Sequence, residues 1–149
     1  MTEGLKKEAN KFFWPWPDIP IETFLQRART AASRAYAPYS NFRVGAALLT
    51  SDGSVILGCN VENASYGMTM CAERNALASM VVMGRHDPVA IAIVGGNSGI
   101  PCPPCGACRQ VLTEFNPDMY VVLESPNKAI VMRAHELLPL SFSLSGARV

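Results

Sequence analysis

Two short stretches that carry cysteine constrain this chain more than any other feature. The first is Thr69–Asn75 (T-M-C-A-E-R-N) and the second is Pro103–Gln110 (P-P-C-G-A-C-R-Q). Together they offer three thiols and one carboxylic acid. Zinc prefers four ligands, and a catalytic zinc site leaves one position open for water. We therefore predict a zinc site of three thiolates with an acid/base beside it, which requires a fold that brings the two stretches together.

Length, composition and charge limit what the chain can be. With 149 residues, of which 49% are hydrophobic and 17% are charged, it is large enough for one domain with a buried core. Its formal net charge of +1 is a poor footprint for nucleic-acid binding, which usually needs a basic patch. No apolar run approaches the roughly 18 residues that span a membrane, and the polar N-terminus has no signal-peptide core. We expect a cytoplasmic protein that binds neither nucleic acid nor membranes.

The cysteines favour a metal site over disulfide bonds. The chain has five of them, an odd number, and disulfides are rare in the cytosol. Cys105 and Cys108 are three residues apart, which at a helix start places both sulfurs on one face. Cys71 begins another predicted helix, and the N–H groups at both helix starts favour thiolate over thiol.

Two neighbours of Cys71 complete the predicted site. Glu73 is two residues away, and positions i and i+2 of a helix do not face the same way, which argues against Glu73 as a fourth ligand. A position beside the bound water, where it accepts a proton, suits Glu73 better. Three thiolates and a hydroxide exceed the charge of Zn²⁺, and Arg74 is placed to offset that excess.

Cysteine spacing leaves a second possibility open, which is a closed structural zinc site without catalysis. Its four ligands would be Cys71, Cys102, Cys105 and Cys108. Pro103 and Pro104 make the chain after Cys102 stiff and extended, which argues against this geometry. A structural site also gives no role to Glu73. The fifth cysteine, Cys59, lies in a predicted strand and is expected to be a small buried hydrophobe.

Hydrophobic periodicity and turn signals predict the secondary structure. Helices are expected over Ile21–Tyr36, Cys71–Met83, Cys105–Phe115 and, briefly, Glu136–Leu138. Strands are expected over Val44–Thr50, Val55–Glu62, Val89–Gly95, Met119–Glu124 and Ala129–Arg133. The third and fourth strands are joined through a helix and should be parallel. The first two strands flank an Asp52-Gly53 turn, and only about four residues separate the last two, so both pairs should be antiparallel hairpins.

These connections predict an α/β fold, namely a three-layer α/β/α sandwich around a mixed five-stranded sheet whose last two strands are antiparallel. A single catalytic domain would span residues 21–149. Residues 1–20 would form an arm in which Phe12, Phe13, Trp14 and Trp16 precede or alternate with helix-blocking prolines. We expect these aromatic rings to pack on the domain or on a neighbouring subunit; a dedicated ligand-binding role is the alternative.

Two polar residues stand out in the second predicted strand. Asn60 and Glu62 fall on the same face by the two-residue period of a strand. From this spacing alone, a solvated strand end is the simpler explanation, and a ligand contact is the alternative.

The two cysteine-bearing stretches resemble the zinc-dependent nucleoside and nucleotide deaminases, whose signature is His or Cys two residues before Glu, followed by P-C-x-x-C. The matching motifs here are C-A-E-R and P-C-G-A-C-R-Q. Three further stretches narrow the resemblance to the small homotetrameric cytidine deaminases. They are Tyr39–Phe42 (Y-S-N-F) before V-G-A-A-L-L, Asn60–Tyr66 (N-V-E-N-A-S-Y), and Leu137–Pro139 before Ser141-Phe142. The resemblance covers roughly residues 21–145.

This resemblance implies a reaction, the hydrolytic deamination of cytidine and 2′-deoxycytidine to uridine and 2′-deoxyuridine in pyrimidine salvage. Cys71, Cys105 and Cys108 would hold one Zn²⁺ per subunit. Glu73 would carry protons from the water to ring N3 and help ammonia leave. Arg74 would hydrogen-bond the cysteine sulfurs.

The resemblance also implies how the substrate is held. Asn60 and Glu62 would bind the ribose 3′-hydroxyl, which reverses the simpler explanation of that pair. Phe42 would pack on the pyrimidine, as would Phe142 from a neighbouring subunit of a homotetramer with shared active sites. The backbone at Ala72 would read the edge of the base.

One position departs from the family pattern. Family members commonly have Ser where this chain has Pro103, and they use the backbone carbonyl there to accept a hydrogen bond from the exocyclic amine. Proline keeps its carbonyl and lacks only the N–H, so we expect the contact to survive.

Three alternatives remain at this point: a polynucleotide cytosine deaminase, a blasticidin-type deaminase, and a non-catalytic domain held by four cysteines. The near-neutral charge argues against a polynucleotide substrate. Glu62 argues against it too, because a carboxylate facing the 3′-oxygen would repel a 3′-phosphate. Polynucleotide deaminases also resemble one another in having a helix where this chain has a tight hairpin between its last two strands. The Asn60/Glu62 pair favours a nucleoside over the antibiotic.

Overall fold

The computed structural model describes residues 13–97 and 99–144. The elements in chain order are α1 (Ile21–Ala32), β1 (Val44–Thr50), β2 (Val55–Cys59), η1 (Tyr66–Met68), α2 (Ala72–Val82), β3 (Pro88–Gly95), α3 (Gly106–Phe115), β4 (Tyr120–Leu123), β5 (Ile130–Arg133) and α4 (Ala134–Leu137). Each predicted helix and strand is present, and η1 adds one 3₁₀ turn before α2. Within the described residues, no helix is long and apolar enough to cross a membrane.

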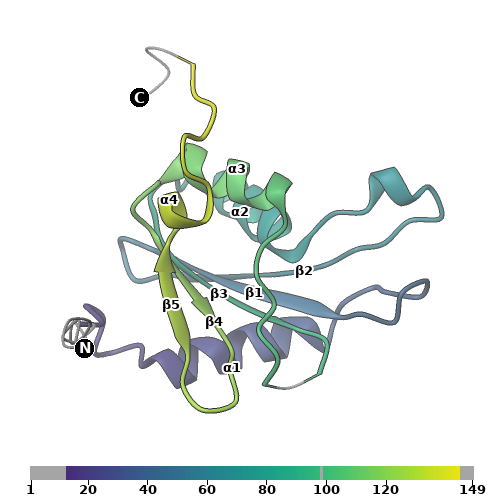
Figure 1. The fold of residues 1–149 in the computed structure, drawn as a ribbon, viewed down its shortest axis with the longest axis horizontal. Coiled ribbons are helices and arrows are strands. Elements are labelled where there is room, and N and C mark those ends of the chain that lie inside the picture. Colours follow the sequence, from purple (N-terminus) through teal and green to yellow (C-terminus); the bar gives the residue numbers. More distant parts are fainter. Residues whose placement is uncertain (1–12, 98, 145–149) are drawn as a thin grey trace, which may run out of the picture.

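The five strands form one sheet in the order β2-β1-β3-β4-β5. β3 and β4 pair in parallel, and the pairs β1–β2, β1–β3 and β4–β5 are antiparallel. Figure 1 shows α1 on one face of this sheet and α2, α3 and α4 on the other. The predicted three-layer sandwich with a mixed sheet and an antiparallel last pair is therefore confirmed.

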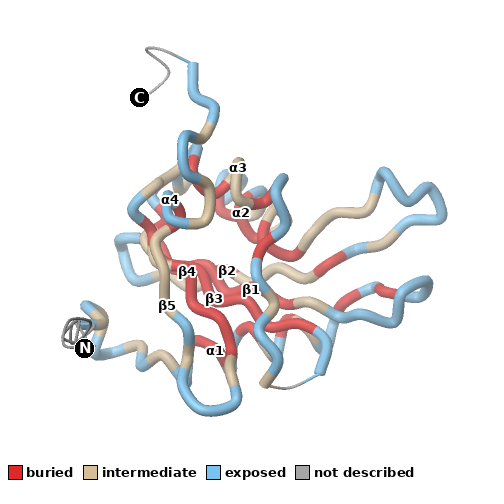
Figure 2. Tube along the Cα trace, viewed as in Figure 1, coloured by how far each residue is buried: buried red, intermediate tan, exposed pale blue. Residues whose placement is uncertain are grey.

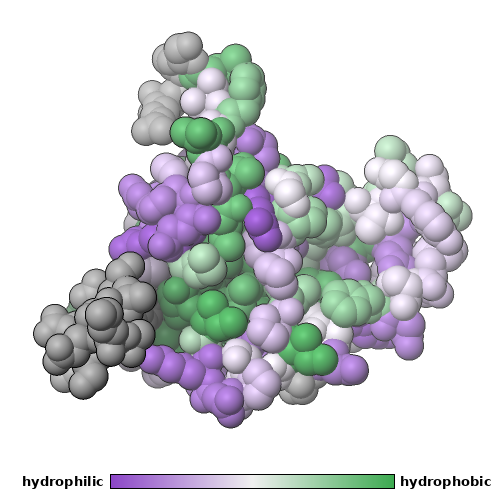
Figure 3. Space-filling model, in the orientation of Figure 1, coloured by the Kyte–Doolittle hydropathy of each residue, from purple (hydrophilic) through white to green (hydrophobic). Residues whose placement is uncertain are grey.

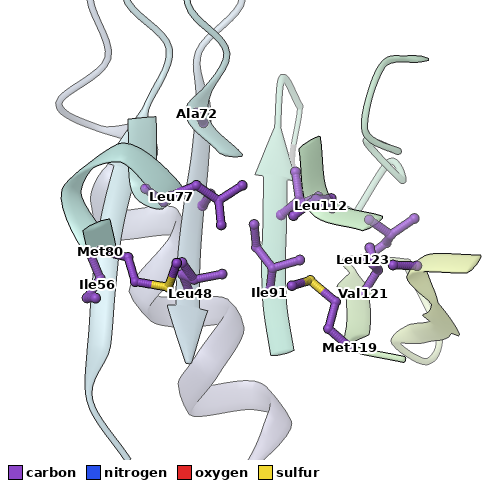
Figure 4. Packing of buried hydrophobic residues seen from close by; sticks show 14 residues of the cluster. Leu48, Ile56, Ala72, Leu77, Met80, Ile91, Leu112, Met119, Val121 and Leu123 are labelled. Atoms are coloured by element: carbon purple, nitrogen blue, oxygen red, sulfur yellow. The ribbon is translucent and has the colours of Figure 1, made fainter. Parts of the chain in front are cut away.

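Alternate residues of the central strands supply two hydrophobic cores. In β1, Leu48 packs in the core beneath α2 and α3, whereas Leu49 packs in the core beneath α1. Ile91 and Ala92 of β3 divide in the same way. Figure 4 shows Leu48, Leu77, Ile91 and Leu112 meeting between the sheet and the helices, and Figure 2 shows the central strands buried along their length. Because helices cover both faces, these strands are apolar on both sides of the pleat.

Two glycines let a helix approach the sheet closely on each face. A Cβ on Gly45 of β1 would overlap the backbone of α1. A Cβ on Gly58 of β2 would overlap the backbone of α2 at Ala72 and Ala76. Because Gly58 lies beneath the first turn of α2, its missing side chain decides how close the start of that helix lies to the sheet.

Two predicted elements are longer than the observed ones. The helix predicted to reach Tyr36 ends at Ala32, because the N–H of Ala35 bonds the carbonyl of Ala32 at the short spacing of a 3₁₀ turn. Tyr36 instead forms an isolated bridge with Val61. The strand predicted to reach Glu62 ends at Cys59, after which Val61 forms isolated bridges with Tyr36 and Met70 in place of β1.

The described tryptophans of the N-terminal arm pack on the domain, as predicted. The rings of Trp14 and Trp16 lie 5.9 Å and 5.7 Å from the ring of Tyr120, and both contact the core beneath α1. Phe13 is 78% exposed, and Phe12 lies outside the described residues.

Candidate active site

The three predicted ligand thiols meet at the N-terminal ends of α2 and α3. Cys71 and Cys105 are the N-cap residues of these helices, and Cys108 lies in the first turn of α3. The three Sγ atoms all lie within 4.8 Å of one another, and those of Cys71 and Cys105 are 3.8 Å apart. A tetrahedral zinc ion with Zn–S bonds of about 2.3 Å needs sulfurs about 3.8 Å apart, so the cluster fits this ion.

Cys102 is not a member of this cluster. Its sulfur lies against Gly95 at the end of β3, on the edge of the core beneath α2 and α3. Burial raises the pKa of the Cys102 thiol to about 11, which keeps it protonated at neutral pH. Among the described residues only three cysteines come together, so the closed four-cysteine site does not form.

The prediction for Cys59 is wrong in degree. Cys59 is only partly buried, because β2 is an edge strand of the sheet and is covered less completely than β1. Its backbone carbonyl accepts a hydrogen bond from Asn75 of α2 at 2.8 Å.

Arg74 faces the thiols from the first turn of α2. Its Nη2 lies 3.6 Å from the Sγ of Cys71. A hydrogen bond from the Cys108 thiol, aided by Arg74, lowers the pKa of Cys71 to about 5. The same hydrogen bond, together with burial, raises the pKa of Cys108. The guanidinium of Arg74 therefore favours the thiolate form of Cys71.

Glu73 lies beside the thiols without joining them. It is the second residue of α2, is only 4% exposed, and is absent from the metal-binding cluster. Burial raises the pKa of its carboxyl, and the negative charge of Cys71 adds to that effect. A carboxyl whose pKa is shifted toward neutrality is suited to take up and release protons at physiological pH.

Glu62 is tied to the loop that follows α1. Its Oε1 accepts a hydrogen bond from the hydroxyl of Ser40. Its Oε2 accepts from the backbone N–H groups of Tyr39 at 2.9 Å and of Ser40 at 3.3 Å. These bonds, chiefly that from the Ser40 hydroxyl, lower the pKa of Glu62 and keep it ionised.

Asn60 is tied to the same loop and is buried. Its Oδ1 accepts the N–H of Val44 at 2.8 Å, and its Nδ2 donates to the carbonyl of Phe42 at 2.8 Å. With only 8% of its surface exposed, Asn60 is not part of a solvated strand end, and that explanation is wrong for this residue.

The ring of Phe42 packs against Gly96, the residue that follows β3. Gly96 has a φ of +64°, and a Cβ there would overlap the Phe42 ring. Gly95, one residue earlier, contacts Cys102. Besides burial, the negative charges of Glu73 and Cys71 raise the pKa of the Cys102 thiol. The end of β3 therefore lies between Phe42 and Cys102.

The remaining predicted contact residues divide into two groups. Ala72 is the first residue of α2 and is fully buried, with its small side chain in the core beneath α2 and α3. Phe142, in contrast, is 72% exposed on the C-terminal segment, which projects from the end of α4 (Figure 1). Figure 3 shows apolar surface on that segment. The Phe142 side chain is therefore covered little by its own chain.

Sequence reasoning missed the role of two residues within the P-C-G-A-C-R-Q motif. Arg109 donates to the carbonyl of Pro104 at 2.8 Å and to that of Leu137 at 3.0 Å. Gln110 donates to the carbonyl of Phe142 at 3.0 Å. The first turns of α3 thus hold both the loop before Cys105 and the C-terminal segment. Their place inside the motif was the only signal for this role.

Comparison with known proteins agrees with this geometry. Residues 19–124 match the family described as the cytidine and deoxycytidylate deaminase zinc-binding region. The cytidine deaminase of Halalkalibacterium halodurans is 51% identical over 124 residues, which cover 82% of this chain and 93% of that protein. The crystal structure of cytidine deaminase from Burkholderia pseudomallei has a TM-score of 0.77 at 50% identity and covers 81% of this chain and 98% of that chain. A blasticidin-S deaminase from Bacillus cereus is 32% identical over 107 residues, 67% of this chain and 76% of that protein.

The fold and the thiol cluster together define a zinc-dependent hydrolytic deaminase, with one zinc ion per subunit. The chain belongs to the cytidine and deoxycytidylate deaminase family, as its motifs predicted.

Proposed function

We propose that this protein converts cytidine and 2′-deoxycytidine to uridine and 2′-deoxyuridine by hydrolysis, in pyrimidine salvage in the cytoplasm. The observation that carries this proposal is the buried carboxyl of Glu73 beside three thiols whose spacing fits zinc. Three protein ligands leave one zinc position for water. The five free cysteines fit a reducing compartment.

The reaction replaces the exocyclic amine with an oxygen from water. Zinc held by the three thiols supplies, when bound, a water whose pKa is lowered toward roughly 7. Glu73 would accept a proton from the water whose oxygen attacks C4, and would deliver that proton to ring N3. It would then carry the second water proton to the exocyclic nitrogen, so that the C4–N bond breaks and ammonia leaves. Arg74 offsets the charge of the thiolates throughout.

The free hydrogen-bonding capacity of Asn60 and Glu62 matches one hydroxyl group. The amide of Asn60 has two N–H groups and donates one of them to Phe42. The carboxylate of Glu62 accepts three hydrogen bonds and offers about four acceptor positions. A hydroxyl that accepts from Asn60 and donates to Glu62 satisfies both. We assign these two residues to the ribose 3′-hydroxyl.

The base would lie between the two regions. Phe42 would pack on the pyrimidine ring, and the backbone of Ala72 would read its edge. The carbonyl of Pro103, in the exposed loop before Cys105, would accept from the exocyclic amine.

A homotetramer would complete the site. Phe142 would reach the pyrimidine from a neighbouring subunit, which accounts for its exposure in a single chain. Leu140 and Leu144 of the same segment are exposed as well, as interface residues are before assembly. Light scattering of the purified protein would give the mass of four chains.

The assay that tests the proposal is the loss of ultraviolet absorbance of cytidine in the presence of the purified protein. A strong chelator should abolish the loss, and added zinc should restore it. Single-stranded oligonucleotide and blasticidin S, assayed in parallel, test the two alternative substrates; net charge and Glu62 argue against the first. The proposal would be overturned if zinc-loaded protein left cytidine unchanged.

A further inference from the structure

The hydroxyl of Ser40 forms hydrogen bonds in two directions. It donates its single hydrogen to Oε1 of Glu62 and accepts the backbone N–H of Phe42 at 3.0 Å. A serine hydroxyl has only one hydrogen to give, so the bond to Glu62 fixes its orientation. The residue between Ser40 and Phe42 is Asn41, whose φ of +55° turns the chain so that both contacts can form.

Without Ser40, two groups would lose their restraint. The carboxylate of Glu62 would keep only the backbone N–H bonds to Oε2, so the carboxylate group could rotate about them and Oε1 would lose its fixed direction. The N–H of Phe42 would lose its partner, although the Phe42 carbonyl would keep its bond from Asn60. Ser40 thus links the acidic group of the sugar subsite to the residue that presents the aromatic ring.

We propose that Ser40 is a positioning residue. It orients the carboxylate of Glu62 so that its free acceptor position faces the substrate sugar, and it holds the backbone of Phe42 at a fixed position relative to Glu62. This inference rests on the proposed function, because it takes the sugar hydroxyl as the group that Glu62 receives. Ser40 acts through Glu62 and Phe42 and does not itself contact the reacting atoms.

The test compares cytidine with 3′-deoxycytidine, which lacks the hydroxyl that Glu62 would receive. In the Ser40→Ala variant, we expect KM for cytidine to rise about 10-fold while kcat changes by about threefold or less, since a hydrogen bond to a charged group is lost. For 3′-deoxycytidine, kcat/KM should fall by about threefold or less. The preference for cytidine over 3′-deoxycytidine should therefore shrink by several-fold.

Three further variants distinguish positioning from general damage. Ser40→Thr keeps the hydroxyl and should restore the wild-type preference. Ser40→Cys keeps the volume but donates weakly, so it should show the same loss as Ser40→Ala even if the alanine variant folds poorly. Ser33→Ala removes an exposed hydroxyl at the end of α1 and should behave as wild type.

Equal losses on both nucleosides, or no loss on either, would overturn the role of Ser40 while leaving the proposed function intact. Failure of the wild-type, zinc-loaded protein to deaminate cytidine would overturn both, and it would be seen before any variant is measured.

Discussion

Two regions of the active site are built in different ways. The zinc region consists of Cys71, Glu73, Cys105 and Cys108, all at the starts of α2 and α3. The second region, residues 39–44 together with Asn60 and Glu62, is the one proposed to bind the sugar and is called the sugar region here. All of it but Val44 lies outside helices and strands. Packing of helices on the sheet holds the first region. Hydrogen bonds between side chains and backbone hold the second.

This difference suggests how the two regions divide their work. The zinc region brings its thiols and Glu73 together within one chain, and it buries Cys108 and Glu73. Burial raises the pKa of the Glu73 carboxyl, which suits it to exchange a proton. The sugar region leaves one donor and one acceptor unused and keeps Phe42 half exposed. We therefore expect substitutions in the zinc region to affect kcat and substitutions in the sugar region to affect KM.

The largest effect is expected for Glu73→Gln. General acid–base catalysis contributes about 10²–10⁴-fold, and here one carboxyl would serve both proton transfers, so kcat should fall by about 10³-fold or more. Zinc content and melting temperature should not fall, because the amide removes a buried carboxyl whose ionised form is penalised by burial. Steady-state kinetics, metal analysis and thermal melting check the three parts. A variant that keeps fast turnover would remove Glu73 from the chemistry.

The sugar region should give a smaller and different response. In Glu62→Gln the amide still accepts a hydrogen bond but presents no charge, and KM for cytidine should rise about 10- to 100-fold with kcat little changed. Michaelis–Menten analysis separates the two constants. A fall in kcat at constant KM would mean that Glu62 takes part in the chemistry, and the division between the regions would fail.

Gly58→Ala tests whether the close packing of α2 on β2 supports the zinc region. A Cβ there overlaps the backbone of Ala72 and Ala76, so α2 must shift or the sheet must yield. Overpacking of this kind costs about 1–3 kcal/mol, which in a chain of this size lowers the melting temperature by about 2–4 °C per kcal/mol. Because the start of α2 carries Cys71, a chelator should also remove zinc faster. Gly67→Ala is the matched control, since among the described residues no atom beyond its chain neighbours lies within 4 Å of a Cβ at that position. Equal melting temperatures for both variants would contradict the close-packing argument.

The zinc region was the easier of the two to predict from sequence. Its ligands are close together in the chain or begin helices, and helix geometry alone aims Cys105 and Cys108 at one point. The environment of Asn60 could not be predicted from local spacing, because its hydrogen-bond partners Val44 and Phe42 lie 16 and 18 residues away in the chain. Only the fold shows that Asn60 is buried, so spacing favoured a solvated strand end until the resemblance assigned it a ligand.

The fold was predicted well where a local sequence pattern determines the structure. It was predicted less well where a contact with a residue far along the chain determines the structure. The connection lengths gave the directions of three strand pairs correctly. The helix expected to reach Tyr36 stops at Ala32, since Tyr36 is taken up by a bridge to Val61. That bridge is also what places Glu62 beside residues 39–44, so the error in the helix end and the uncertainty about the polar pair have one cause.

The smallest effect is expected for Cys102→Ala, and it sharpens the boundary of the zinc region. Cysteine spacing allowed Cys102 as a fourth ligand, but its sulfur lies against Gly95 and stays protonated. The variant should keep one zinc per subunit and activity within about twofold, with a stability loss near 1 kcal/mol from the smaller side chain. Cys105→Ala, which removes one of the three clustered thiols, should lose most of its zinc under the same dialysis. If the two variants lost zinc alike, the site would be closed by four cysteines, no position would remain for water, and Glu73 would have no proton to move.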